Sequence, residues 1–241
     1  MPSTNTLLRA VNLSSAFCNL RPLTGIGGFI DEPAFSIGDW CRQFILGPPF
    51  SWRWNRTFVQ FALSPGVQDY PQNLPLFGWM EKTTIFDSTV NPSVTKELNV
   101  KLNLGESSVI ESPVEVSPRL DDDNGNITFR FMPVPDKAYT AVVTYQMAAP
   151  IFKSINDTWA PIPDYLSYLT NQGFLAKSYE FINDERWGPA MQLFVRQVIA
   201  ANQGLSDSEV NIFLGERLDS ARQQQNVLGN NQSARQGRGA F

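Results

Sequence analysis

The spacing at which apolar residues recur along the chain changes twice, and these two changes limit the fold more than any other feature. Apolar residues recur at three- and four-residue steps in residues 6–17 and about 32–45, which predicts two helices. The Gly-Pro-Pro sequence at 47–49 ends the second one, because proline lacks the backbone donor that a helix needs. From about residue 51 apolar and polar residues alternate, as in half-buried strands, and helical spacing returns at Trp159. Segregated strands and helices predict an α+β fold.

These changes of period divide the chain into four segments. We expect residues 1–50 and 159–220 to form a helical bundle, with an antiparallel β-sandwich-like domain inserted at 51–158. Residues 221–241 are rich in Gln, Asn, Gly and Ser, contain no acidic residue and cannot bury a core of their own. They are expected to form an extended, flexible C-terminal arm, and a disordered solubilising tail is the alternative.

Within the β region, three stretches predict particular strands. Alternating apolar residues over 96–104 indicate a half-buried strand whose inward face includes Leu102. Residues 111–120 are interrupted by prolines and suit an edge strand. Residues 127–131 and 139–145 both alternate, and the sequence PVPDK between them favours a turn, so they predict a β-hairpin.

The C-terminal part has clear helix signals. Pro163 is placed to begin a helix, and residues 187–202 carry apolar residues at helical spacing. Gly204 can end that helix, and Ser206 with Glu209 fits the capping box that begins another.

Composition excludes several kinds of chemistry. The chain has no histidine, so the usual general base, the usual zinc ligand and every Ser-His or Cys-His arrangement are absent. The two cysteines, Cys18 and Cys41, lie in apolar helical patterns and are expected to be buried free thiols, with a disulfide between them as the alternative that no pattern supports. The sequence DDDNGN at 121–126 lacks the glutamate of a calcium-binding loop and favours a turn. We predict no catalytic residue, no metal and no cofactor.

An aromatic cluster, PPFSWRWNRTF at 48–58, has two interpretations. Its tryptophan and arginine side chains can stack on bases or sugars. Alternation, however, places the two tryptophans on one face and Arg53 on the other, which favours a buried seam between helices and sheet. The residues expected at this seam are Trp52, Trp54, Phe58 and Trp79.

The charge of the chain bears on its partners. Its net charge is -4, from 19 basic and 23 acidic residues, so it lacks the basic surface expected of a nucleic-acid-binding protein. No apolar stretch is long enough to cross a bilayer, and the N-terminus lacks the pattern of a signal peptide. Low charge with 12% aromatic residues suits a surface covered by other subunits, or a well-buried monomer.

Several stretches together resemble a known family. They are PPFSWRWNRTFVQF, GVQDYPQNLPLFGWMEKTTIFD, NITFRFMPVPDKAYTAVVTYQ, TWAPIPDYLSYLTNQGFLAKSYEFINDER and ANQGLSDSEVNIFL. The chain is similar, over about residues 30–225, to the head-to-tail connector (adaptor) proteins of short-tailed bacteriophages. The resemblance implies a virion protein of the neck, assembled in the host cytoplasm, whose copies form a ring, commonly of twelve, around the DNA exit channel.

The resemblance also implies partners. The ring would lie between the portal protein and a tail nozzle or tail-hub protein, and genomic DNA would pass through it without specific binding. No membrane contact is implied. The C-terminal arm would dock on the portal through basic and apolar side chains, namely Arg222, Val227, Leu228, Arg235, Arg238 and Phe241.

Two other functions remain open from the residues. One is a carbohydrate-binding tail component that uses the β domain and exposed tryptophans. The other is a cell-wall hydrolase that uses the carboxylates of Asp184 and Glu185, although adjacent acids at a helix end diverge around its axis. The leading prediction is a non-enzymatic, ring-forming structural protein.

Overall fold

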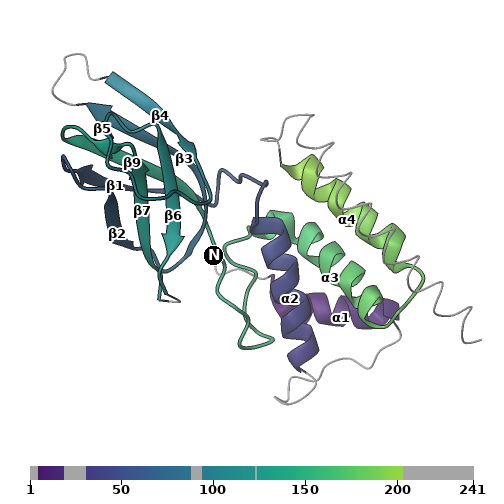
Figure 1. Cartoon of the computed structure of the whole chain (residues 1–241). Helices are drawn as coiled ribbons and strands as arrows, with labels where there is room; N and C mark the ends of the chain where they lie inside the picture. Colours follow the sequence, from purple (N-terminus) through teal and green to yellow (C-terminus); the bar gives the residue numbers. More distant parts are fainter. Residues whose placement is uncertain (1–4, 19–30, 88–93, 123, 203–241) are drawn as a thin grey trace, which may run out of the picture. The chain divides into compact units, whose positions relative to one another are not determined.

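The computed structural model describes residues 5–18, 31–87, 94–122 and 124–202 (Figure 1). The chain divides into two compact units. One comprises Met1–Ile45 and Ile151–Phe241, and its described elements are helices; the other comprises Leu46–Pro150 and contains the strands.

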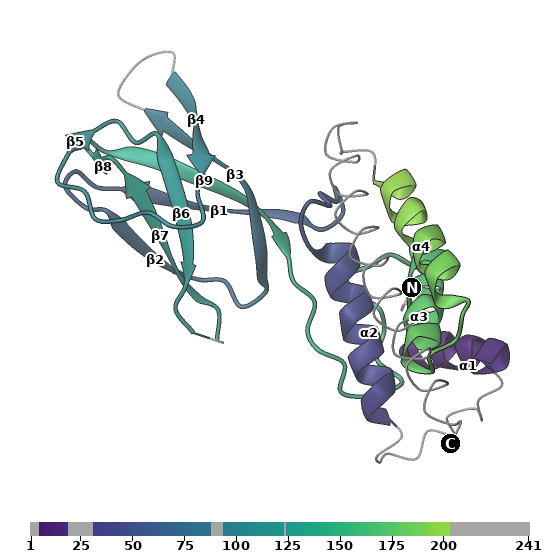
Figure 2. The same ribbon diagram turned by 45° about the vertical axis from the view of Figure 1, so that its right-hand side comes forward.

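The helical unit is built from helices whose apolar faces meet. Helix α3 packs along both α4 and α1, and α3 and α4 lie side by side (Figure 2). Phe194 of α4 is fully buried, and its ring centroid lies 4.9 Å from that of Phe44 on α2. The described helices are α1 (Leu7–Cys18), α2 (Asp31–Leu46), the 3-10 helix η1 (Asp164–Leu166), α3 (Ser167–Phe181) and α4 (Trp187–Ala201).

A buried arginine ties the segment before η1 to helix α2. The guanidinium carbon of Arg42 lies 3.4 Å from the centroid of the Phe152 ring, and its Nη2 donates a hydrogen bond to the Thr158 carbonyl. One turn earlier on the helix, the Asp39 carboxylate accepts a hydrogen bond from the Phe152 backbone at 2.9 Å. Burial lowers the pKa of Arg42 to about 10, so this side chain remains charged at neutral pH.

The β unit contains one large mixed sheet. Its strand order is β1-β9-β3-β4-β6-β7-β2, and all neighbours are antiparallel except the parallel pair β4 and β6. A second, two-stranded sheet pairs β5 with β8. The strands of the large sheet are β1 (Arg56–Leu63), β2 (Asp69–Asn73), β3 (Phe77–Asp87), β4 (Val94–Val100), β6 (Glu115–Leu120), β7 (Asn126–Met132) and β9 (Tyr139–Met147), and the small sheet contains β5 (Ile110–Glu111) and β8 (Val134–Pro135).

The large sheet curls until its two ends approach each other. Phe61 belongs to β1 at one end of the strand order, and its ring centroid lies 5.9 Å from that of Tyr70 on β2 at the other end. It also stacks on Phe129 of β7 at 5.7 Å. Inward-facing residues from all seven strands thus share one core, and the sheet is barrel-like and nearly closed.

The expected fold class, a helical bundle with an inserted antiparallel β-sandwich-like domain, is wrong. The protein is mostly a large mixed β-sheet, nearly closed, with four α-helices among the described residues. A sandwich requires two separate sheets, whereas pairing here runs without a break through β3, β4 and β6. Alternating apolar residues give the same pattern in both architectures, so the alternation could not separate them. The expected C-terminal arm and the helix predicted after Ser206 lie outside the described residues.

The predicted hairpin is also wrong, although both of its strands exist. Strand β7 pairs with β6 and β2, while β9 pairs with β1 and β3. The residues between them include Val134 and Pro135, which form β8 and pair in parallel with β5, and the Val134 backbone donates to the Val109 carbonyl at 2.9 Å. The intervening segment therefore leads the chain to another part of the sheet instead of folding β9 back on β7.

Two smaller expectations about strands need correction. Strand β4 ends at Val100, so Leu102 is not inward-facing and is 97% exposed. Strand β6 lies inside the sheet between β4 and β7 and is not an edge strand. Only Glu115 and Val116 of β6 pair with β4, so Pro118 lies in the half that pairs on one side only, where proline is tolerated.

The helix predictions within the described residues are confirmed. The patterns over 6–17 and 32–45 correspond to α1 and α2, and the pattern over 187–202 corresponds to α4. Pro163 comes directly before η1 and α3, as expected of a residue that begins a helix.

Candidate functional site

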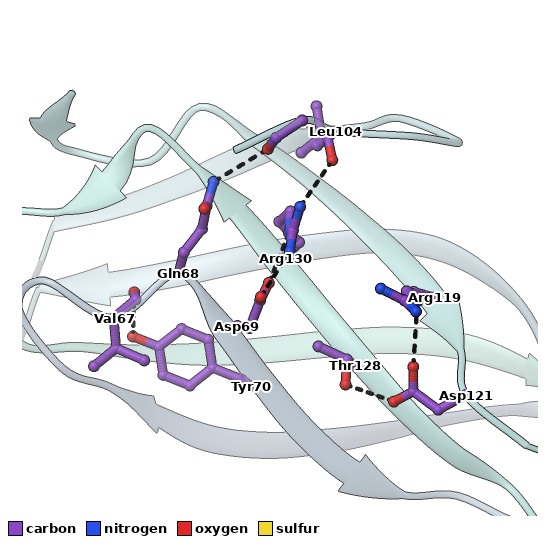
Figure 3. A network of polar contacts seen from close by, with 10 residues as sticks. Val67, Gln68, Asp69, Tyr70, Leu104, Arg119, Asp121, Thr128 and Arg130 are labelled. Carbon is purple, nitrogen blue, oxygen red and sulfur yellow. Dashed lines mark hydrogen bonds and ion pairs between the residues drawn. The ribbon is translucent and has the colours of Figure 1, made fainter. Parts of the chain in front are cut away.

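A groove of about 560 Å³ lies on the outer face of the β unit. Its floor comes from strands β2, β6 and β7, and one wall comes from residues 102–104, which follow β4 (Figure 3). The residues that line it are Asp69, Pro71, Leu102, Asn103, Leu104, Ser117, Pro118, Arg119, Asp121, Thr128 and Arg130.

The register of the three strands places these side chains in rows. Asp69 on β2 is opposite Arg130 on β7, which is opposite Ser117 on β6. The next row contains Pro71, Thr128 and Arg119. Because side chains alternate between the two faces of a strand, the residues between them, such as Tyr70 and Phe129, point into the core.

The first row contains a bidentate ion pair. Arg130 Nε and Nη2 donate to the two carboxylate oxygens of Asp69 at 2.7 and 2.8 Å (Figure 3). These hydrogen bonds lower the pKa of Asp69 and raise that of Arg130. Arg130 Nη1 also donates to the Leu104 carbonyl at 3.4 Å, and Gln68 Nε2 donates to the Gly105 carbonyl at 3.4 Å. Arg130 of β7 and Gln68, which directly precedes β2, thus both contact the wall of the groove.

A second charged pair lies at the far end of the groove. Thr128 Oγ1 donates to the Asp121 carboxylate at 2.6 Å, and Arg119 Nε lies 3.5 Å from the other oxygen of this carboxylate. The Arg119 side chain is 76% exposed. The groove therefore has two arginines and two aspartates, each arginine beside one carboxylate.

The DDDNGN stretch beside the groove is a turn. The Asp122 carboxylate accepts hydrogen bonds from the backbone of Asn124 and Asn126 at 2.9 and 3.1 Å, and Gly125 has a φ of 83°. Turns favour this combination of Asp, Asn and Gly. Among the described residues, no group of three or more His, Cys, Asp or Glu side chains is placed to hold a metal ion.

The aromatic residues of the 48–58 cluster are not among those that line the groove. Trp52 is buried and Trp54 is half-buried, with their ring centroids 5.3 Å apart, while Arg53 is exposed. Trp79 is half-buried and its Nε1 donates to the Leu46 carbonyl at 3.0 Å, whereas Phe58 is 66% exposed. A seam formed by these four residues between helices and sheet stays a prediction.

A polar network attaches this cluster to the sheet. Glu81 on β3 accepts hydrogen bonds from Ser51 Oγ, from Gln146 Nε2 on β9, and from Arg56 Nε at 2.7 Å. Gln146 Nε2 also donates to the Trp52 carbonyl at 3.1 Å. Burial opposes ionisation of Glu81, but these donors prevail and its pKa is lowered. The carboxylate therefore holds the start of β1 against β3 and β9.

The carboxylates considered for a hydrolase lie in the connection between α3 and α4. Asp184 accepts hydrogen bonds from Arg186 Nε at 2.9 Å and Nη2 at 2.7 Å. These bonds lower the pKa of Asp184 to about 2, so it cannot hold a proton for a leaving group near neutral pH. Cys41 is a buried free thiol, as expected, and burial raises its pKa, whereas Cys18 is only half-buried.

No protein-family model and no curated protein matches this chain. None of the described helices is long and apolar enough to span a membrane.

Sequence reasoning missed the groove because its lining residues come from separate stretches and form no single motif along the chain. Asp69, Arg119 and Arg130 come together only through the pairing of β2, β7 and β6. The available signal was weak: in the alternating segment at 127–131, Thr128 and Arg130 occupy the polar positions. The expected arm residues, from Arg222 to Phe241, lie outside the described residues.

Proposed function

We propose that this protein is a structural virion subunit that forms a ring and links the portal to the tail of a short-tailed bacteriophage, with the ring lining the DNA exit channel. The family resemblance supplies the identity of the assembly. The neighbours are the portal protein, a tail nozzle or tail-hub protein, and further copies of the chain itself.

One observation carries the proposal of assembly through protein contacts. In the segment from Val100 to Val114, four large apolar side chains that do not line the groove are exposed to solvent: Val100, Val109, Ile110 and Val114. Exposed apolar side chains that gather on one surface are typical of sites of protein association. We call these four residues the apolar strip, and we propose that they contact a neighbouring copy, since head-to-tail contacts close into a ring when the rotation permits.

The charge of the chain agrees with passage of DNA through the ring. The net charge is -4, and three of the four arginines of the β unit, namely Arg56, Arg119 and Arg130, each lie beside a carboxylate. Cations neutralised in this way attract phosphate weakly, which suits a channel that DNA must leave quickly.

The test of ring formation is the mass of the purified chain in native mass spectrometry and its appearance in negative-stain images. The wild type is expected to form rings, alone or with portal protein. The double variant with Ile110→Asp and Val114→Asp is expected to stay monomeric, because it places charge in the proposed contact. Val67→Asp, at an exposed apolar residue of the same unit outside the strip, is the control. Rings of the double variant would contradict the proposal.

Attachment to the portal is tested separately. Deletion of residues 222–241 is expected to leave a folded protein that no longer binds portal protein in co-sedimentation. Normal binding by the shortened chain would show that the arm does not dock on the portal. That result would not bear on the proposed contact between copies in the ring.

A further inference from the structure

The groove of the β unit has the size and construction of a ligand site. Its volume of about 560 Å³ lies within the range of about 300–1,000 Å³ that is typical of small-molecule sites. Its floor is made by three adjacent strands with a fixed register, so the backbone positions of the residues in the floor are set before a ligand arrives. The wall at Leu104 is fastened by Arg130, and the neighbouring Gly105 by Gln68.

The charges of the groove argue against an anionic ligand. Arg130 forms a bidentate pair with Asp69, and Arg119 lies 3.5 Å from Asp121. Two positive and two negative side chains leave no net charge to attract phosphate or sulfate. An uncharged ligand avoids the cost of separating either pair.

The polar atoms of the groove suit hydroxyl groups. Each oxygen of Asp69 accepts one hydrogen bond from Arg130 and retains capacity for another. The Arg119 guanidinium is mostly exposed, and its 3.5 Å contact with Asp121 is longer than a usual charge-assisted hydrogen bond. A hydroxyl both donates and accepts, so neighbouring hydroxyls on a ring match neighbouring acceptors and donors of this kind.

The apolar residues complete the match to a sugar. Leu102 is 97% exposed in the wall of the groove, and Pro71 and Pro118 lie in its floor. Such side chains provide contact surface for the C–H groups of a sugar ring. Because the described aromatic side chains lie elsewhere, the groove lacks a stacking platform, and we expect modest affinity.

We propose that this groove binds a neutral oligosaccharide, with Arg119, Thr128 and the carboxylate of Asp69 contacting its hydroxyl groups. The site differs from the tryptophan platform that the sequence suggested, since Trp52 is buried and neither Trp52 nor Trp54 lines the groove. Binding by a single copy requires no ring, so this inference does not depend on the proposed adaptor function.

The test measures binding of three neutral hexasaccharides, namely maltohexaose, cellohexaose and N-acetylchitohexaose, to the full chain by calorimetry and saturation-transfer NMR. At least one is expected to bind. Arg119→Ala and Thr128→Val are each expected to weaken that binding about tenfold, the effect of losing one hydrogen bond to a charged or polar partner. Arg53→Ala, at an exposed arginine that does not line the groove, should leave it unchanged. Circular dichroism of each variant checks that it is folded.

Four results would overturn the proposal. The first is that none of the three oligosaccharides binds, and the second is that Arg119→Ala and Thr128→Val leave binding unchanged. The third is that Trp54→Ala abolishes binding while the groove variants do not, and the fourth is that the chain prefers a sulfated heparin hexasaccharide to every neutral one. The third result would return the site to the aromatic cluster, and the fourth would make the groove an anion site.

Discussion

Gly125 has a left-handed backbone conformation and lies directly against the backbone of Pro75. Its φ is 83°, and a Cβ atom added there would lie 2.3 Å from Pro75 Cα. We therefore expect Gly125→Ala to lower the free energy of unfolding by at least about 2 kcal/mol, because it adds a backbone clash to the cost of a left-handed conformation. Urea denaturation followed by tryptophan fluorescence measures this difference.

Gly66 provides the matched control for that variant. Its φ of 75° is similar, but a Cβ atom added there would meet nothing within 4 Å. Gly66→Ala should therefore lower the free energy of unfolding by only about 1 kcal/mol, which is the cost of a left-handed backbone at alanine without a clash. Equal losses for the two variants would mean that the contact with Pro75 is relaxed at no cost.

The ionisation of Asp184 is a second property of single residues that can be measured. Its pKa of about 2 depends on the hydrogen bonds from Arg186. A lowered carboxyl pKa contributes stability that is fully present above the unfolded value of about 3.9 and is lost as the pH falls toward 2. Carboxyl NMR titration should show a midpoint near 2 in the wild type and a rise toward about 3.9 in Arg186→Gln. An unchanged midpoint in the variant would assign the shift to another cause.

Among the elements, β2 is the short strand at one end of the sheet, and the pair Asp69–Arg130 is its main side-chain link to β7. Because this pair is bidentate and partly buried on the arginine side, a double-mutant cycle with Asp69→Asn and Arg130→Gln should give a coupling of about 0.5–1 kcal/mol. The pair Arg119–Asp121, with one contact at 3.5 Å, should give a coupling near zero. A larger coupling for the second pair would reverse the ranking that the geometry gives.

The sequence predicted where helices and strands lie along the chain, but not which strands pair. Periodicity correctly located the helices at residues 7–18 and 187–201 and the strands at 126–132 and 139–147, because the period of apolar residues reports which face of an element is buried. It does not report which strand lies alongside. β7 and β9 were therefore assigned to each other, although β9 lies between β1 and β3.

The same limit explains the missed groove. Its polar residues face outward, where packing does not constrain their identity, and they converge only once β2, β7 and β6 are paired. Arg130 and Asp69 are 61 residues apart in the chain. No local pattern could connect them, whereas the turn at 121–126 was predictable because the hydrogen bonds from the Asn124 and Asn126 backbones to the Asp122 carboxylate are local.

At the scale of the whole molecule, the β unit has its own hydrophobic core and fastened ends, as an independently folding domain does. Its core includes Leu63, Ile85, Phe129 and Val143, all from within residues 46–150. Its two ends are also fastened to the sheet, since the backbones of Asn55 and Met147 are hydrogen-bonded at 3.2 Å and Ala148 donates to the Leu76 carbonyl at 2.8 Å. A domain with its own core and secured ends needs no contribution from the rest of the chain to fold.

We therefore expect a fragment of residues 46–150 to fold alone, with dispersed amide NMR signals and a single cooperative urea transition. Phe129→Ala should lower its free energy of unfolding by about 3–5 kcal/mol, because Phe129 is fully buried at the centre of the core. Phe58→Ala, at an exposed position of β1, should change it little. A fragment with broad NMR signals and no cooperative transition would mean that the sheet depends on the helical unit for its stability, and the two units would then have to be treated as one folding domain.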